Sequence, residues 1–160
     1  MHEFLESMQY SEFGLWVAGG DTILAYPTIL ALHTLGLGLV VGMSAIVDCR
    51  VLGVGRSVPL GDLDRLFRVM WGGFALNATT GVVLFIAAAS DKAYQEIFHL
   101  KIALIILALV TASRLRRMVF RRPIPDAPIP QAAKTLAVAS LVLWTGAIVA
   151  GRLMAYTTTF

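Results

Sequence analysis

The chain contains four apolar stretches, each long enough to cross a bilayer as a helix. They cover residues 22–47, 69–90, 95–115 and 133–156. The hydrocarbon core of a bilayer is about 30 Å thick, and a helix crosses it in roughly 20 residues. Only 14% of the residues are charged, whereas a soluble domain normally carries about 25%. The sequence therefore predicts a small polytopic membrane protein.

The spacing of these stretches also predicts the fold. In lipid, a helix satisfies its own backbone hydrogen bonds, and short connections make neighbouring helices run in opposite directions. We therefore predict an all-α fold in which residues 1–160 form one membrane domain, a transmembrane antiparallel four-helix bundle. Segment 2–18 mixes large apolar side chains with glutamates, which predicts an N-terminal amphipathic helix on the membrane surface.

Basic residues gather in the two loops that follow the first and third stretches: Arg50, Arg56, Arg65 and Arg68, then Arg114, Arg116, Arg117, Arg121, Arg122 and Lys134. The other side of the bundle is acidic. Because cytoplasmic loops are enriched in Lys and Arg, we predict a multi-pass protein of a bacterial inner membrane with both termini periplasmic. The proline-rich segment 121–130 is then a cytoplasmic linker. The net charge of +3 reflects these loops, so nucleic acid is not an expected partner.

Ionisable groups inside the spans are the candidate functional residues, because each is costly to insert. His33 is expected about 10 Å, and His99 about 7 Å, along its helix from the outer end. A b-type haem in a membrane is held by histidines of different helices at similar depth, and imidazole is a good iron ligand. The pair predicts haem b with both histidines as axial ligands of the iron. The alternative is that they only satisfy polar contacts inside the bundle.

A haem carries two propionates, which favour cations near the membrane surface. Lys101 and Arg152 are both expected on the outer side and are the candidates for this role. Either could instead be a snorkelling interfacial residue. Gly36 lies three residues after His33 on the same helical face, where a small residue would let the macrocycle approach. Glycines in this span, such as Gly38 and Gly42, also suit plain helix packing.

Other metal sites have less support. Cys49 is the single cysteine, and the chain has no CxxC or CxxCH motif, which excludes structural zinc and covalent c-type haem. Copper(I) favours thioether and thiolate ligands, but the methionines do not cluster along the sequence and are better explained as packing residues. The chain also has no nucleotide-binding or hydrolase motif.

Three segments carry a resemblance to a known family: YPTILALHTLGLGLVVGMSAIVDCRVLG at 26–53, WGGFALNATTGVVLF at 71–85 and FHLKIALIILAL at 98–109. Together they resemble a family of small bacterial four-span membrane proteins described only as a domain of unknown function. More distantly, a first-span histidine with a lysine in a later span is similar to HemJ-type protoporphyrinogen oxidases and the CopD group. The HemJ type binds haem b through that histidine, so the resemblance implies His33 as haem ligand and Lys101 as the matching lysine. The long N-terminal helix and His99 depart from the HemJ pattern, which weakens transfer of the oxidase activity more than transfer of haem binding.

We therefore expect an integral membrane haem b protein that transfers electrons between the quinone pool or a partner and the periplasmic side. One alternative is a HemJ-like porphyrinogen oxidase in which Lys101 or Arg50 contacts substrate carboxylates, so enzymatic activity is left open. Another is a haem-free accessory or copper-handling subunit. Besides the lipid bilayer, we expect a protein partner or a second copy of the chain, because the sequence contains no soluble domain.

Overall fold

The fold is entirely helical in the part of the chain that the computed structural model describes, residues 2–19, 24–120, 128–154 and 156. Its helices, in chain order, are α1 (His2–Gln9), α2 (Glu12–Gly19), α3 (Tyr26–Leu52), α4 (Leu60–Leu63), α5 (Leu66–Ile86), α6 (Ala89–Lys92), α7 (Glu96–Phe120) and α8 (Gln131–Leu153). Most of the linker predicted at 121–130 lies outside the described residues. The all-α class is confirmed.

Four helical segments are long and apolar enough to cross a membrane, as the sequence predicts. They are α3, the segment Leu60–Ile86 that contains α4 and α5, α7, and α8. Their mean hydropathy over 18 residues lies between 1.6 and 2.0. Helix α3 has Pro27 in its first turn, and Gly53 caps it directly after Leu52. The φ of Gly53 is 103°, the left-handed conformation that closes many helices. Helix α3 is therefore longer at its C-terminal end than the stretch 22–47 suggests.

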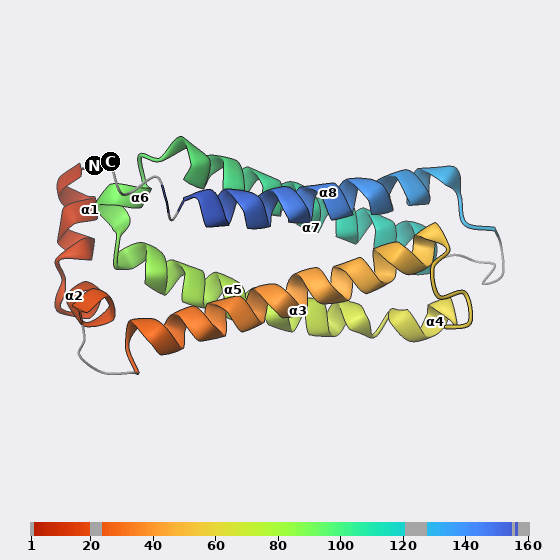
Figure 1. The fold of residues 1–160 in the computed structure, drawn as a ribbon, viewed down its shortest axis with the longest axis horizontal. Helices are drawn as coiled ribbons and strands as arrows, with labels where there is room; N and C mark the ends of the chain where they lie inside the picture. The colour runs from red at the N-terminus through yellow and green to blue at the C-terminus, as the bar shows by residue number, and fades with distance from the viewer. Residues whose placement is uncertain (1, 20–23, 121–127, 155, 157–160) are drawn as a thin grey trace.

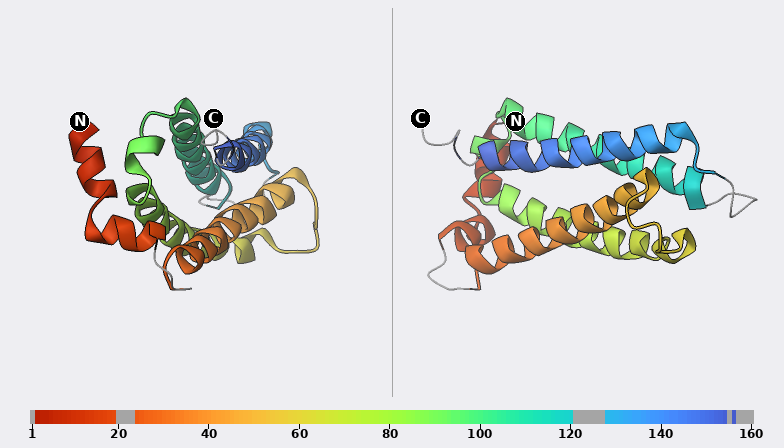
Figure 2. Two further views of the ribbon diagram at one scale, coloured as in Figure 1. Left: turned by 60° about the vertical axis from the view of Figure 1, so that its left-hand side comes forward. Right: turned by 45° about the vertical axis from the view of Figure 1, so that its right-hand side comes forward.

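The long helices pack as two pairs, α3 with α5 and α7 with α8, and the pairs meet mainly through α3 and α8 (Figure 1). Close packing of α3 on α5 depends on Gly36 and Gly73, where the two backbones touch. The two pairs spread apart toward the end of the molecule where α1, α2 and α6 lie (Figures 1 and 2). We call this the α1 end and the opposite end the α4 end. The buried apolar core lies between the middle of the bundle and the α4 end: Val40, Val47, Val51, Leu63, Phe67, Met70, Ala108, Ala112, Leu115, Val119, Ala133, Ala137 and Trp144.

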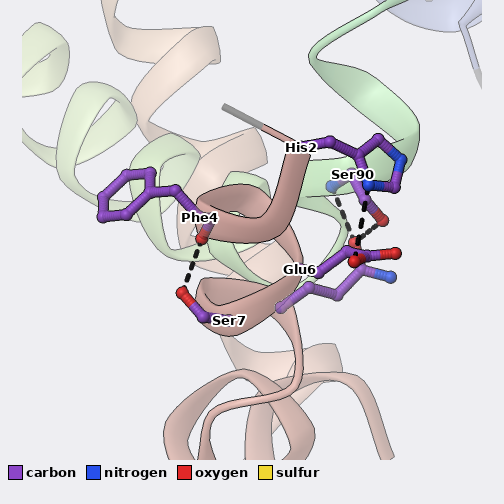
Figure 3. A network of polar contacts seen from close by, with 6 residues as sticks. His2, Phe4, Glu6, Ser7 and Ser90 are labelled. Atoms are coloured by element: carbon purple, nitrogen blue, oxygen red, sulfur yellow. Dashed lines mark hydrogen bonds and ion pairs between the residues drawn. The ribbon is translucent and has the colours of Figure 1, made fainter.

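Segment 2–18, predicted as one surface helix, forms two helices. The break has a local cause, because the hydroxyl of Ser11 accepts a hydrogen bond from the Gly14 amide (3.1 Å) and caps the start of α2. Helix α1 packs beside α6 (Figure 3), where the side-chain oxygen of Gln9 accepts hydrogen bonds from the amide (2.8 Å) and hydroxyl (2.6 Å) of Ser90. The N-terminal helices therefore cover one end of the bundle.

At the α4 end, an ion pair joins the last turns of α7 to the residue after α4. The Arg116 guanidinium donates two hydrogen bonds to the Asp64 carboxylate, at 2.8 and 3.0 Å, and stacks over the Phe67 ring. Such a forked pair fixes both distance and orientation. It brings the basic end of α7 beside the basic loop that follows α3.

Candidate functional site

His33 lies half-buried on α3 and faces α5. Its Nδ1 atom is 3.0 Å from the main-chain oxygen of Asn77 and 3.1 Å from the hydroxyl oxygen of Thr80. The Asn77 amide in turn donates a hydrogen bond to the main-chain oxygen of His33 (2.8 Å). Reciprocal contacts of this kind hold the imidazole ring in one orientation.

These partners also decide which ring nitrogen of His33 carries the proton. The Asn77 carbonyl can only accept, and the Thr80 hydroxyl has a backbone acceptor of its own, the Leu76 oxygen at 2.7 Å. Nδ1 must therefore be the N–H donor in the neutral ring, which leaves the lone pair on Nε2. Histidines that bind metal through one ring nitrogen commonly donate the other N–H to a carbonyl in this way. Nε2 is then the nitrogen that could bind a metal, and the Asn77 side-chain amide nitrogen lies 3.4 Å from it.

The glycines around His33 serve helix packing. A Cβ at Gly36 would lie 2.7 Å from the Asn77 amide nitrogen and 2.9 Å from the Gly73 oxygen, so the space beside Gly36 is filled by α5. The sequence analysis expected Gly36 to give a macrocycle room to approach, but the structure has no open space beside this residue. A Cβ at Gly81 would lie 3.1 Å from Cε1 of His33, so Gly81 makes room for the imidazole. The environment of Gly38 is open.

His99 lies in the first turn of α7 and is exposed. Its Nδ1 pairs with the main-chain oxygen of Gln95 (3.0 Å), and its ring packs edge-on against Phe98, which stacks on Phe85 of α5. Within the described residues, no hydrogen bond or ring contact joins His99 to His33. The sequence predicts a similar depth for His33 and His99, but in the structure the two rings contact different partners.

Lys101 differs from His99 in being partly buried. It is half-buried on α7, its side chain packs against Gly151 of α8, and its ammonium group lies within electrostatic range of His33. Lys92 on α6 is within electrostatic range of Lys101 and donates a hydrogen bond to the Met154 oxygen (3.3 Å). Burial lowers the pKa of Lys92, and the nearby Asp91 opposes that shift. We call Lys92, Lys101 and Arg152 the basic cluster of the α1 end.

Arg152 follows Gly151 directly, and its exposed guanidinium lies over the Tyr156 ring, 5.5 Å from the ring centre. No salt bridge to an acidic side chain in the described part of the chain involves any of the three cluster residues.

The structure also brings together several buried polar side chains that the sequence analysis did not identify. Asp48 of α3 is 1% exposed, and its neighbours are Ser44, Ser140 and Trp144. The sequence analysis ended the first span at residue 47, one residue before Asp48. A signal was available, since a serine four residues before an acid lies on the same helical face.

The remaining candidates have structural roles. Arg50 donates to the main-chain oxygens of Val58 (2.8 Å) and Arg56 (3.2 Å) and so holds the loop after α3. Cys49 is a free, partly buried thiol that lines a hydrophobic cavity with Arg50 and neighbouring apolar residues. No group of three or more His, Cys, Asp or Glu side chains that could hold a metal occurs in the described ranges.

Comparisons of this chain with protein-family models, with curated proteins and with solved structures found no match. The suggested family and its similarity to HemJ and CopD proteins thus remain predictions from the sequence. Functional inference depends on the site itself.

Proposed function

We propose that the protein is an integral membrane protein that binds haem b through His33 and carries electrons. In this proposal the four long helices form an antiparallel bundle across a bacterial inner membrane, with the α1 end on the periplasmic side. The charge pattern supports this orientation, because the arginine-rich loops belong to the α4 end. The electron donor or acceptor in the membrane is the quinone pool or a protein partner.

The observation that carries the proposal is the hydrogen bond between Nδ1 of His33 and the Asn77 oxygen. It supports an imidazole held in place by α5 with its lone pair on Nε2. Iron bound there would replace the contact of Nε2 with the Asn77 side-chain amide nitrogen, which is 3.4 Å long. The basic cluster of the α1 end supports the same assignment, because Lys101 lies within electrostatic range of His33 and forms no salt bridge with an acidic side chain among the described residues. A haem bound there would supply a one-electron couple, and Lys101 would meet its propionates.

The identity of the second axial ligand is a separate part of the proposal. His99 was paired with His33 on depth alone, and its ring contacts Phe98 and the Gln95 oxygen. For His99 to bind the same iron, its side chain would have to leave these contacts. Mutation of each histidine therefore tests the two ligands independently.

A pyridine haemochrome assay on the purified protein tests the proposal. We expect a b-type spectrum from the wild type and loss of most haem from His33→Ala. His99→Ala should convert a low-spin spectrum to high-spin if His99 is the second ligand, and should leave the spectrum unchanged if it is not. A colourless wild type purified with haem supplied during expression would exclude haem binding and favour a haem-free membrane subunit.

The HemJ-like alternative shares the His33 assignment and differs in the role of Lys101. There the half-buried ammonium would bind a carboxylate of a porphyrin substrate. Oxidation of a porphyrinogen by the haem-loaded protein, lost in Lys101→Met with haem content retained, would favour an enzyme over an electron carrier.

A further inference from the structure

A second polar site lies inside the bundle, between α3 and α8, and the haem proposal makes no use of it. Its residues are Asp48 (1% exposed), Ser44 (3%), Ser140 (0%) and Trp144 (3%). We call these four residues the Asp48 site. Asp48 lies one turn before the end of α3 at Leu52, about 6 Å from that end. The site is thus buried but close to the α4 end.

One oxygen of the Asp48 carboxylate has no partner. Oδ1 is buried without a hydrogen bond, while Oδ2 is 3.4 Å from the Ser44 hydroxyl, which in turn lies 3.3 Å from the Ser140 hydroxyl. No lysine, arginine or histidine in the described part of the chain forms an ion pair with Asp48. A carboxylate removed from water without a counter-charge costs several kcal/mol. A proton or a bound cation would offset this cost.

The distances between the oxygens indicate which of the two fits the site. Ser44 Oγ lies 3.3 Å from Ser140 Oγ and 3.4 Å from Asp48 Oδ2. Hydrogen bonds between oxygens are usually about 2.5–3.0 Å long, so these contacts are longer than normal. Hard cations of the size of Ca²⁺ bind oxygen at about 2.3–2.6 Å, which puts adjacent ligands at right angles about 3.3–3.7 Å apart. Na⁺ has nearly the same radius, so the oxygens are spaced as neighbours around such an ion.

The Trp144 indole completes the arrangement. Its Nε1–H donates to Ser44 Oγ at 3.1 Å. A hydroxyl oxygen has two lone pairs, so Ser44 can accept this bond and still direct a lone pair at a cation. The indole fixes the position of that oxygen and closes the site on the α8 side.

We propose that the Asp48 site binds Na⁺ between α3 and α8. One carboxylate neutralises one monovalent charge, whereas a divalent ion would remain half uncompensated in a buried setting. Simple protonation of Asp48 fits less well, because a carboxylic acid needs a short hydrogen bond to an acceptor, and the Ser44 hydroxyl is 3.4 Å away. Asp48, Ser44 and Ser140 would provide the oxygen ligands, and the bound ion would join α3 to α8.

The test is the Na⁺ dependence of thermal unfolding of the full chain, purified in detergent. The midpoint is measured as NaCl replaces choline chloride at constant ionic strength and constant pH. A ligand that binds only the folded state raises the midpoint with its concentration. We expect the wild type to be stabilised saturably by Na⁺, Asp48→Asn to lose the response, and Ser140→Ala to need several-fold more Na⁺ for the same shift. Asp62→Asn, which changes an exposed carboxylate in α4, is the matched control and should respond like the wild type.

Broadening of the sodium NMR signal by the folded protein provides a second readout that needs no unfolding. It applies to Ser140→Ala if Asp48→Asn fails to fold. Equal midpoints in NaCl and choline chloride would overturn the proposal and leave a water or a proton as the partner of Asp48. So would a Na⁺ response, or sodium line broadening, that both Asp48→Asn and Ser140→Ala retain.

Discussion

The Nδ1 atom of His33 and the main-chain carbonyl oxygen of Asn77 lie 3.0 Å apart, and this contact joins the first two long helices in the α1 half of the bundle. Because the acceptor is a backbone atom, substitution of the Asn77 side chain does not remove it. The ring orientation of His33 is consequently set by the packing of α3 on α5. That packing requires glycine at positions 36 and 73, where the helix backbones touch.

Thr80→Val should weaken haem binding while His33 is unchanged. Valine has the same shape as threonine but lacks the hydroxyl that lies 3.1 Å from Nδ1 of His33. Loss of an outer contact to a metal-binding histidine typically costs about 10–100-fold in affinity. Because the Asn77 oxygen remains, we expect the low end of that range. Haem titration of the apoprotein, followed by Soret absorbance, measures it.

Thr79→Val is the matched control, because Thr79 is the neighbouring residue on α5 and is exposed. It should bind haem like the wild type. Equal affinity in the two valine variants would mean that the Thr80 hydroxyl does not support the ligand.

Gly36→Ala should destabilise the protein, and Gly38→Ala should not. The new methyl at position 36 would meet the α5 backbone at 2.7 Å, which forces the two helices apart, whereas nothing lies within 4 Å of a methyl at position 38. Overpacking of this kind costs about 1–3 kcal/mol. An alanine in an open helical position instead gains up to about 1 kcal/mol over glycine.

Thermal unfolding of the two glycine variants in one detergent separates these effects. A melting temperature for Gly36→Ala equal to that of Gly38→Ala would contradict the close approach of α3 and α5. The comparison does not depend on haem, so it tests the fold alone.

Hydropathy predicted the four long helices but not where they end. The estimate for the first span stopped at Val47 because Asp48 and Arg50 are charged, yet α3 continues to Leu52. Asp48 is buried beside the hydroxyl of Ser44 on its own helix, which also contacts Ser140 of α8. A single sequence does not reveal which partner on another helix will satisfy a buried acid, so the Asp48 site was missed.

The same limit applies to the predicted haem site. The rise per residue gives the depth of His33 and His99, but the direction in which each ring points depends on how its helix packs. His33 is turned toward Asn77, and His99 toward Phe98 and the Gln95 oxygen. Lys101 is two residues from His99 and therefore on another face of α7, and it lies within electrostatic range of His33.

Arg116→Ala should lower the free energy of unfolding by about 0.5–1 kcal/mol. This is near the upper end of the contributions measured for salt bridges that are exposed to solvent. The side chains of Arg116 and Asp64 are 30% and 43% exposed, so water and salt weaken the pair, but its two hydrogen bonds and the contact with Phe67 add to it. The loss should shrink as salt concentration rises.

Arg65→Ala is the control for that experiment. The Arg65 and Asp62 side chains are 66% and 56% exposed and only three residues apart, so the expected loss is below about 0.5 kcal/mol. Chemical denaturation of both variants at low and high salt gives the comparison. A larger loss for Arg65→Ala would show that the Arg116 pair does not hold the α4 end together.

Lys101→Met should lower the reduction potential of the bound haem more than Arg152→Leu does. A nearby fixed cation favours the reduced haem, which is the more negative form, so removing the cation favours the oxidised form. Lys101 is half-buried and within electrostatic range of His33, whereas Arg152 is exposed and lies over the Tyr156 ring. At an effective dielectric constant of about 20, a charge several ångströms away shifts a one-electron couple by an amount on the order of tens of millivolts. Screening by water and salt should leave Arg152→Leu with a smaller shift.

Redox titration of both variants and the wild type in one detergent measures the two shifts. The opposite order would assign the propionates to Arg152 and leave Lys101 as a packing residue against Gly151.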